Sequence, residues 1–231
     1  MIINKESIIS GLVIPVFKPL NWTSFDVVKK IRFDIKKAYD IKKIKVGHAG
    51  TLDPLATGLL LICTGKKTKI IQNLQNLEKT YYATFYIGKT TPSFDKETEY
   101  DNTYPIDHIN QNLITEAING FKGKIKQKPP IYSALKVNGK RLYEIARKGE
   151  SAKIKKRNIQ IFEFKLLANN LPELDFKIKC SKGTYIRSLA NDYGKKLNSG
   201  AHLKYLERYS IGEYTIKESY SLGSINKLLF N

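Results

Sequence analysis

The segment Gly47–Gly58, GHAGTLDPLATG, contains the residue types best placed for chemistry. It sets the carboxylate of Asp53 in a tight loop rich in glycine and proline, directly before the apolar run Leu59–Thr64. Catalytic groups are often found on loops that a rigid strand holds in place. Pro54 biases the backbone of Asp53 toward an extended conformation and away from helix.

A purely structural interpretation of the same loop stays open at this point. On that interpretation Asp53 caps the following turn, and His48 is a loop histidine whose hydrogen bonds are satisfied locally. The residue types and their spacing do not by themselves separate the structural interpretation from the catalytic one.

The best-known phosphate-binding signature is absent from the chain. The stretch Gly58–Thr68, GLLLICTGKKT, invites comparison with a phosphate-binding loop. However, six residues separate Gly58 from Gly65 where that motif requires four, and Lys67 stands where a Ser or Thr must follow the lysine.

The histidines and cysteines do not form a recognisable metal site. His48, His108 and His202 are scattered, without the spacing of a zinc-binding helix, and the two cysteines, Cys63 and Cys180, cannot make a disulfide framework. We therefore expect no metal and no other cofactor, and the cysteine count favours the reducing cytoplasm.

Charge is the informative feature of the composition. The 231 residues include 40 Lys and Arg against 21 Asp and Glu, a formal net charge of +19, and only six of the forty cations are Arg. The largest shares lie in residues 1–50, with +6, and residues 151–200, with +7, so the charge does not form a detachable tail. A surplus of this sign favours a polyanionic partner, for a cytoplasmic protein usually nucleic acid. The alternative is that a lysine-rich genome accounts for the surplus of positive charge.

The pattern of apolar residues predicts a mixed α+β protein with a largely antiparallel sheet. No apolar run reaches the roughly 18 residues needed to span a bilayer, so we expect no membrane association. Residues 47–58 are expected as a loop. The expected strands are 11–17, 59–64, 81–87, 159–167 and 174–180, and the expected helices are 23–39, 110–121, 141–148, 187–197 and 225–230.

Residues 121–149, FKGKIKQKPPIYSALKVNGKRLYEIARKG, form a basic segment that is more typical of a projecting arm than of a core element. Their cations are expected to meet phosphates, although a solvated basic face is the alternative. These cations are Lys122, Lys124, Lys126, Lys128, Lys136, Lys140 and Arg141.

Taken together, six segments resemble, in order, the motifs of the TruB family of bacterial tRNA pseudouridine synthases, and the resemblance runs from about residue 11 to the end. The most specific is GHAGTLDPLATGLL. The others are FKPLNWTSFD (17–26), KTYYATFYIG (79–88), residues 129–149, CSKGTYIRSLANDYG (180–194) and GAHLKYLERYSIG (200–212).

The resemblance implies a pseudouridine-synthase-like α+β fold, with a central, mainly antiparallel mixed sheet flanked by helices and an active-site cleft across the sheet. It implies an RNA isomerase that converts uridine 55 in the T-loop of tRNA to pseudouridine, without metal or cofactor. The target uridine would be flipped out, and its uracil would leave the C1′–N1 bond, rotate and rejoin through C5.

The same resemblance implies a single catalytic domain over residues 1–231, with a thumb-like RNA-binding insertion at about 121–150. We expect no C-terminal RNA-binding domain of the PUA type, and a monomer in the cytoplasm with the T-arm stem-loop of tRNA as its partner.

Roles follow from the matching positions. Asp53 matches the catalytic aspartate and Arg187 the basic residue that pairs with it, the alternative for Arg187 being an ordinary phosphate contact. Tyr81 matches the tyrosine that stacks on the target base, and Tyr185 a second active-site aromatic. If 81–87 is a strand, Tyr82 lies on the opposite face from Tyr81, and the alternative is that Tyr81 is core while Tyr82 faces the RNA.

The remaining matches concern substrate binding. His48 matches the histidine that helps to displace the target nucleotide, and Lys18 with Pro19 forms a wall near the site. Leu206 matches an apolar residue lining the pocket, and Lys136 belongs to the arm that grips the RNA.

One loop departs from the family pattern. Where the family often carries Thr-Asp-Thr-x-Asp, this chain has Thr91-Pro92-Ser93-Phe94-Asp95, so that Pro92 replaces an acidic residue. Two alternative functions stay open: a non-catalytic RNA-binding or tRNA-folding protein on the same scaffold, and a pseudouridine synthase acting on another RNA.

Overall fold

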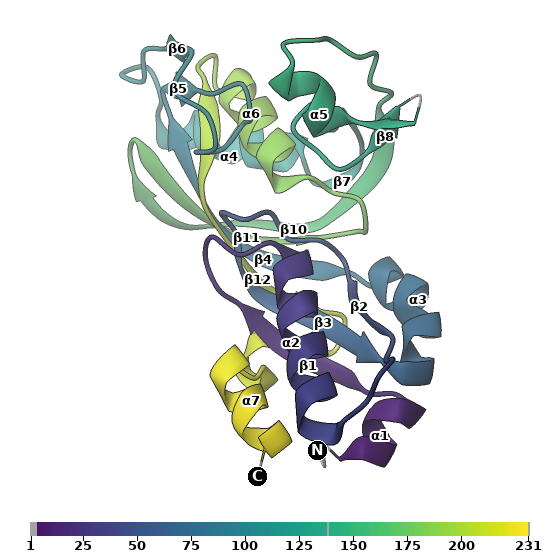
Figure 1. Ribbon diagram of the computed structural model, residues 1–231. Coiled ribbons are helices and arrows are strands. Elements are labelled where there is room, and N and C mark those ends of the chain that lie inside the picture. The colour runs from purple at the N-terminus through teal and green to yellow at the C-terminus, as the bar shows by residue number, and fades with distance from the viewer. Residues whose placement is uncertain (1–3, 138, 231) are drawn as a thin grey trace. The chain divides into compact units, whose positions relative to one another are not determined.

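The computed structural model describes residues 4–137 and 139–230. The chain forms two compact units, of which unit 1 comprises residues 1–81 and 206–231 and unit 2 comprises residues 82–205 (Figure 1). The boundary falls inside two strands, β4 (Lys79–Ile87) and β12 (Ala201–Ile211), so each of these strands contributes residues to both units.

The sheet of unit 1 is organised around β3 (Thr57–Thr64). β1 (Val13–Lys18) and β2 (Val46–Ala49) both pair with β3 in antiparallel fashion, whereas the end of β12 pairs with it in parallel. The short β13 (Tyr214–Thr215) pairs with β12. Because β3 carries the uninterrupted apolar run, it is suited to the position that is covered on both faces.

Both faces of β3 are indeed buried in apolar clusters. Leu60 and Ile62 pack in the cluster that contains residues of α2 (Ser24–Tyr39) and α7 (Leu222–Phe230). Leu59, Leu61 and Cys63 belong to a second cluster, together with Leu74 of α3 (Ile71–Asn76). Three further short helices lie in unit 1: α1 (Lys5–Ser10) and the 3₁₀ helices η1 (Gly65–Ile70) and η2 (Ile216–Glu218).

Helix α2 forms where its sequence signals predict it. Thr23 caps its first turn in a reciprocal arrangement with Asp26, and the chain leaves the helix at Asp40, whose φ of 48° is left-handed. Its apolar residues recur at helical spacing, so the buried ones point into the first cluster.

Unit 2 contains strands in the order β4–β11–β10–β7, with β11 spanning Glu173–Cys180, β10 spanning Arg157–Asn170 and β7 spanning Gly123–Gln127. Its helices are α4 (Gln111–Gly120), α5 (Leu142–Arg147) and α6 (Ile186–Lys196). Two small hairpin sheets pair β5 (Lys89–Thr90) with β6 (Asn102–Thr103) and β8 (Lys136–Val137) with β9 (Lys140–Arg141).

The core of unit 2 is aromatic. The rings of Phe85, Phe164 and Phe176, from three neighbouring strands, have centroids 4.8 to 6.2 Å apart. Tyr193 of α6 adds an edge-on ring 5.3 to 5.8 Å from each of them. Aromatic pairs at such distances stabilise a core beyond their buried area, and here they fix α6 against the sheet.

The structure confirms the predicted α+β class and most of the predicted elements. The pairs β1–β3, β2–β3, β7–β10 and β10–β11 are antiparallel and β3–β12 is parallel, so the sheet is mixed and largely antiparallel. The predicted arm contains β7, β8, β9 and α5, but its first part does not project, because β7 pairs with β10 as a strand of the main sheet. None of the helices in the described residues is both long and apolar enough to cross a membrane.

Several segments differ from the prediction: helices α1 and α3 and strand β7 were not predicted, and two segments with predicted motifs differ in structure. The expected loop 47–58 begins with a strand, because residues 46–49 form β2 by backbone pairing with β3. Residues 200–212 carry a predicted motif but no predicted element, and they form the long strand β12.

Close approach of β3 and β12 gives the first testable prediction. Gly58 has a φ of +105°, and a Cβ there would lie 2.4 Å from the carbonyl oxygen of Arg208. We expect Gly58→Ala to lower the free energy of unfolding by roughly 3 kcal/mol, from backbone strain plus overpacking.

The matched control is Gly149→Ala, because Gly149 also has a positive φ, of +72°, but no atom within 4 Å of the added Cβ. Gly149→Ala should therefore lower the free energy of unfolding only by the backbone strain, about 1–2 kcal/mol. Urea unfolding of both variants checks the prediction, and equal losses of stability would contradict it.

Candidate active site

Asp53 lies in the connection between β2 and β3, and hydrogen bonds on both sides hold this connection. The Ser24 hydroxyl accepts the N–H of Leu52 (2.8 Å) and donates to the Leu52 carbonyl (3.1 Å). The Pro54 carbonyl accepts the N–H of Asn21 at 2.9 Å. The Asp53 side chain itself stays partly exposed. The loop therefore presents a reachable carboxylate on a fixed backbone.

Lys18 ties the end of β1 to the same connection. Its side chain is completely buried, and Nζ donates to the carbonyls of Trp22 (2.6 Å), Pro19 (2.9 Å) and Pro54 (3.3 Å). Burial lowers the pKa of the Lys18 ammonium to about 8, against the opposing attraction of the Asp53 carboxylate. Lys18 is thus anchored to the connection that carries Asp53, and the wall that Lys18 and Pro19 are expected to form stays a prediction.

Arg208 of β12 is a residue of this site that the sequence analysis missed. It is 1% exposed, and its guanidinium donates to the carbonyls of Leu59 (2.7 Å) and Gly50 (3.0 Å). Burial lowers the pKa of this guanidinium, while the hydrogen-bonded Tyr81 and the charge of Asp53 oppose the shift. Arg208 therefore links the two ends of the Asp53 connection to Tyr81.

A signal for Arg208 was available in the sequence. It is one of only six arginines, and it stands two residues after Leu206, which the family motif had already marked. Alternate residues of a strand share a face, so Leu206 and Arg208 point the same way, and both are buried.

His48 lies on β2, opposite Ile62 of β3, and is half-buried. Burial and the positive charge of Arg208 lower the pKa of its imidazole, so the ring is neutral at neutral pH. Its Nδ1 atom is buried and makes no hydrogen bond within the described part of the chain. The ring also has a hydrogen bond with the backbone of Gly50, which opposes the lowering of the pKa, so the interpretation of His48 as a loop histidine with local hydrogen bonds stays open.

Tyr81 and Tyr82 occupy opposite faces of β4, as predicted. Tyr81 is 8% exposed and shares its face with the buried Ala83 and Phe85, whereas Tyr82 is half-buried on the other face. Tyr81 thus combines a core-like position with the hydrogen bond to Arg208. Its stacking on a target base stays a prediction.

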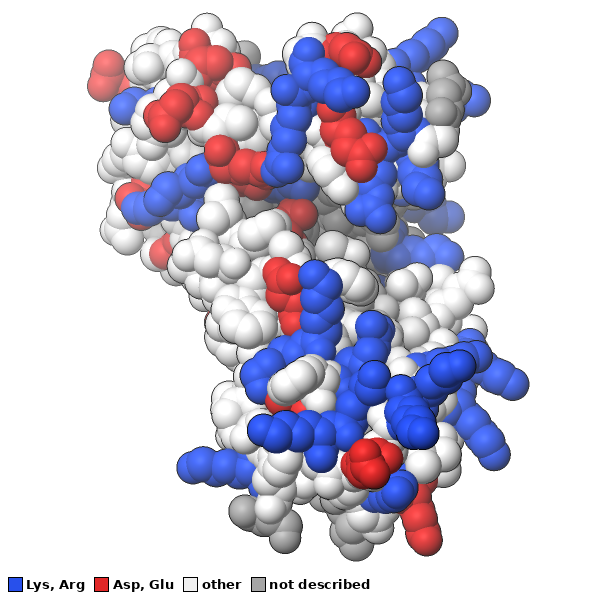
Figure 2. Space-filling model, viewed as in Figure 1, with Lys and Arg blue, Asp and Glu red and all other residues white. Residues whose placement is uncertain are grey.

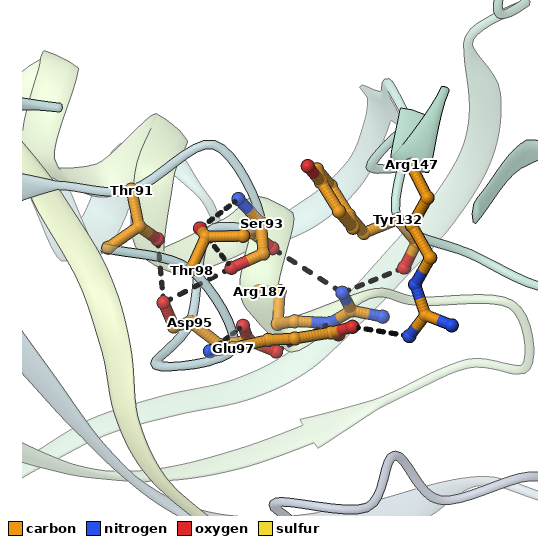
Figure 3. A network of polar contacts seen from close by, with 8 residues as sticks. All are labelled: Thr91, Ser93, Asp95, Glu97, Thr98, Tyr132, Arg147 and Arg187. Carbon is orange, nitrogen blue, oxygen red and sulfur yellow. Dashed lines mark hydrogen bonds and ion pairs between the residues drawn. The ribbon is translucent and has the colours of Figure 1, made fainter. Parts of the chain in front are cut away.

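Unit 2 contains a polar network centred on Arg187, in the first turn of α6 (Figure 3). Nη1 donates to the carbonyls of Tyr132 (2.8 Å) and Ser93 (3.4 Å), and Nε lies 3.5 Å from Oδ2 of Asp95. Arg187 is 3% exposed, so an ordinary phosphate contact is a poor description of it. The guanidinium joins the 91–98 loop to the arm.

The 91–98 loop, which departs from the family pattern at Pro92, is itself well ordered by hydrogen bonds. The Thr91 hydroxyl donates to the Asp95 carbonyl at 2.6 Å, and Oδ1 of Asp95 accepts the N–H of Glu97 at 2.9 Å. Glu97 also pairs with Arg147 of α5 at 2.9 Å (Figure 3). Despite the substitution, the loop still delivers the Asp95 carboxylate to Arg187.

Tyr185 precedes α6 and is half-buried. Its backbone is fixed by the amide of Gln127, which accepts its N–H at 2.8 Å and donates to its carbonyl at 3.0 Å. The predicted arm cations, Lys136 among them, are all exposed. Figure 2 shows Lys and Arg side chains crowded around α5 and β8.

Comparison with known protein families identifies the family of this chain. A family model described as TruB family pseudouridylate synthase (N terminal domain) matches residues 36–186. The chain belongs to this family. As a TruB-family protein it is a pseudouridylate synthase, which is an isomerase, and the predicted family and fold are confirmed.

Relatives named tRNA pseudouridine synthase B match nearly the whole chain. The one from Flavobacterium johnsoniae is 56% identical over 215 residues, which cover 93% of this chain and 94% of the relative. The one from Phocaeicola vulgatus is 53% identical over 219 residues, covering 95% and 93%. A chain in a solved Cbf5–Nop10–Gar1 complex superimposes with a TM-score of 0.71 at 25% identity, covering 95% of this chain and 54% of that one.

In this TruB-family chain the predicted site residues fall into two groups. Lys18, Pro19, His48, Asp53, Tyr81 and Leu206 belong to unit 1, as does Arg208, whereas Lys136, Tyr185 and Arg187 belong to unit 2. The predicted pairing of Arg187 with Asp53 joins residues of different units and stays a prediction.

The buried Lys18 gives a prediction about pH. Its pKa is about 8 in the folded chain and near 10.5 when exposed, so between these values the unfolded chain holds a proton that the folded chain has released. This group therefore makes the folded state more stable as the pH rises through that window.

In Lys18→Met this contribution disappears. We expect the difference in free energy of unfolding between wild type and Lys18→Met to move in favour of wild type as the pH rises from 8 to 10.5. Urea unfolding of both proteins across this range measures it, and other titrating groups cancel in the difference. A difference that does not change with pH would contradict the prediction.

The Arg187 network gives a further prediction. Asp95→Asn removes a charge partner of a buried guanidinium and should lower the free energy of unfolding by about 3–5 kcal/mol. Glu97→Gln, in the same loop, removes a more exposed pair with Arg147 and should lower it by less than about 1 kcal/mol. Chemical denaturation followed by circular dichroism measures the free energy of unfolding of both variants. Similar losses in the two variants would contradict the prediction that Asp95 contributes more to stability than Glu97.

Proposed function

We propose that this protein converts uridine 55 in the T-loop of tRNA to pseudouridine, with Asp53 as the catalytic carboxylate. The observation that carries the proposal is the environment of Asp53: a held but reachable carboxylate between two buried cations, Lys18 and Arg208, with Tyr81 bound to Arg208. The tRNA substrate follows the printed names of the relatives.

The reaction requires one bond to move and no atoms to be added. The C1′–N1 bond of the uridine breaks, the uracil rotates, and a C1′–C5 bond forms, after which C5 loses a proton and N1 carries one. Asp53 attacks the sugar or the base, or abstracts a proton after glycal formation, and each of these roles requires a carboxylate oxygen within reach of the sugar and base. Lys18 and Arg208 provide positive charge that holds this carboxylate in place.

Access to the uridine requires that it leave its stack, which costs a few kcal/mol. We assign His48 to this step, because its lowered pKa leaves a flat, neutral ring that can fill the vacated place. Tyr81 and Tyr185 then contact the flipped base, and Leu206 closes the apolar side of its pocket.

The exposed cations of the arm, Lys136 included, are assigned to the phosphates of the T-arm stem-loop. We further propose that the protein works as a monomer in the cytoplasm, without metal or cofactor.

The test uses an unmodified tRNA transcript, with pseudouridine mapped at single-nucleotide resolution. Wild type should modify position 55, and Asp53→Asn should lower kcat by at least about 1,000-fold while tRNA binding persists, because a catalytic group acts in the transition state. The matched control is Asp107→Asn, which changes an exposed carboxylate of unit 2 and should leave kcat unchanged.

Three results would overturn parts of the proposal. No product with wild type would favour a non-catalytic RNA-binding protein. Product at another position, or only in another RNA, would refute the assigned substrate. Full turnover by Asp53→Asn would refute the assigned catalytic residue.

A further inference from the structure

We infer that unit 1 carries an RNA-binding surface separate from the arm: a cluster of six lysines that holds phosphates of the bound tRNA. The inference rests on the proposed tRNA substrate but concerns a different part of the molecule from the Asp53 site. The cluster, called the lysine cluster below, consists of Lys42, Lys43, Lys45, Lys66, Lys67 and Lys69.

Strand pairing brings the two halves of the cluster together. The lysines at 42–45 precede β2 and those at 66–69 follow β3, and the antiparallel register sets Val46 opposite Thr64. The N–H of Gly65 donates to the Lys45 carbonyl at 2.9 Å, which fastens the two segments side by side. Figure 2 shows cationic side chains gathered over the elements around α2, β2 and α3.

The backbone beneath the cluster is fixed. Thr64 is buried, and its hydroxyl accepts the N–H of Leu12 and donates to the Ile8 carbonyl, both at 3.0 Å. Gly65 has a φ of +47°, and a Cβ there would lie 2.1 Å from the Ile9 carbonyl oxygen, so the turn packs directly on α1. A rigid base lowers the entropy lost when charges bind a ligand, in contrast to a flexible charged loop.

The charge of the cluster is not balanced within the protein. All six lysines are exposed, and within residues 4–137 and 139–230 none of them forms an ion pair. Some other cations are paired, as Lys30 is with Asp34 and Lys177 with Glu163. Like charges held together repel, and a bound polyanion relieves this repulsion.

The composition of the cluster favours phosphates over a protein partner. Protein interfaces are enriched in arginine and aromatic residues and depleted in lysine. Segments 42–45 and 66–69 contain neither arginine nor aromatic residues, although the Arg32 guanidinium donates to the neighbouring Val46 carbonyl at 2.8 Å. Lysine acts as a point charge toward phosphate without reading sequence.

The cluster and the proposed active site lie in the same unit, at opposite ends of β2 and β3. Lys45 and Lys66 flank the end where Val46 pairs with Thr64, whereas Asp53 lies in the connection that joins the other ends of the two strands. The eight residues of β3 span about 25 Å between these ends, so a tRNA whose target nucleotide occupies the site beside Asp53 reaches the cluster with phosphates several nucleotides away from the target.

The experiment compares variants that remove equal charge. Lys42→Gln/Lys43→Gln and Lys66→Gln/Lys67→Gln each remove two cations from the cluster, and a fourfold variant combines them. The control, Lys217→Gln/Lys227→Gln, removes two exposed cations from η2 and α7 in the same unit. Each protein is titrated with unmodified tRNA at several salt concentrations, and kcat and KM are measured for pseudouridine formation.

Each double variant should reduce the slope of log K against log salt by roughly 1.4–1.8, and the fourfold variant by roughly twice that, because each phosphate contact contributes about 0.7–0.9. KM should rise roughly tenfold or more in the fourfold variant while kcat at saturating tRNA stays unchanged. The control should keep the wild-type slope.

A wild-type slope and KM in the fourfold variant, with active wild type, would overturn the inference and leave the proposed function intact. Equal changes in the cluster variants and the control would also overturn it, because net charge alone would then explain them. If wild type makes no pseudouridine, the proposed function fails, and the salt slopes still decide whether the lysine cluster binds tRNA.

Discussion

The site in unit 1 depends on the burial of the Arg208 guanidinium. A guanidinium has five N–H donors and stays charged, so it can be buried only where acceptors and negative charge surround it. The carbonyls of Gly50 and Leu59 supply acceptors from both ends of the connection that carries Asp53. The position of the carboxylate and the burial of the arginine therefore require each other.

The negative charge of Asp53 therefore also stabilises nearby buried cations, in addition to the proposed role of Asp53 in catalysis. Arg208 lowers the pKa of Lys18, whereas the Asp53 carboxylate raises it. Two buried cations repel each other in a site of low polarity, and the anion next to both offsets that repulsion. A site arranged in this way concentrates positive charge around one carboxylate, as a reaction that uses an anionic nucleophile or base requires.

Unit 2 also contains a buried guanidinium surrounded by acceptors, and this one joins segments within the unit. There the buried guanidinium of Arg187 collects the carbonyls of Ser93 and Tyr132 together with the Asp95 carboxylate. One side chain thereby joins a loop, the arm and the first turn of α6. The loop can accept Pro92 in place of an acidic residue because its contribution to this network comes from the Ser93 carbonyl and Asp95.

Local sequence signals predicted the elements whose burial follows a simple period. The continuous apolar run of β3 and the helical spacing of α2 are of this kind. β12 has no such pattern, because the consecutive exposed residues Lys204 and Tyr205 interrupt its alternation. β2 is too short to show a period, and it exists because its backbone pairs with β3.

The parts of the site that sequence reasoning missed are those that depend on contacts between distant segments. The scarcity of arginine and the spacing from Leu206 mark Arg208 in the sequence, but its burial and its role follow from its carbonyl partners some 150 residues away in sequence. The lysine cluster is a similar case, since counting charges located a surplus in residues 1–50 but not its neighbour after β3. Antiparallel pairing of β2 with β3 brings the lysines of segments 42–45 and 66–69 together into one surface. This surface lies at one end of the strand that carries His48. The same backbone pairing therefore determines where the proposed catalytic loop begins, at one end of the two strands, and where positive charge accumulates, at the other end.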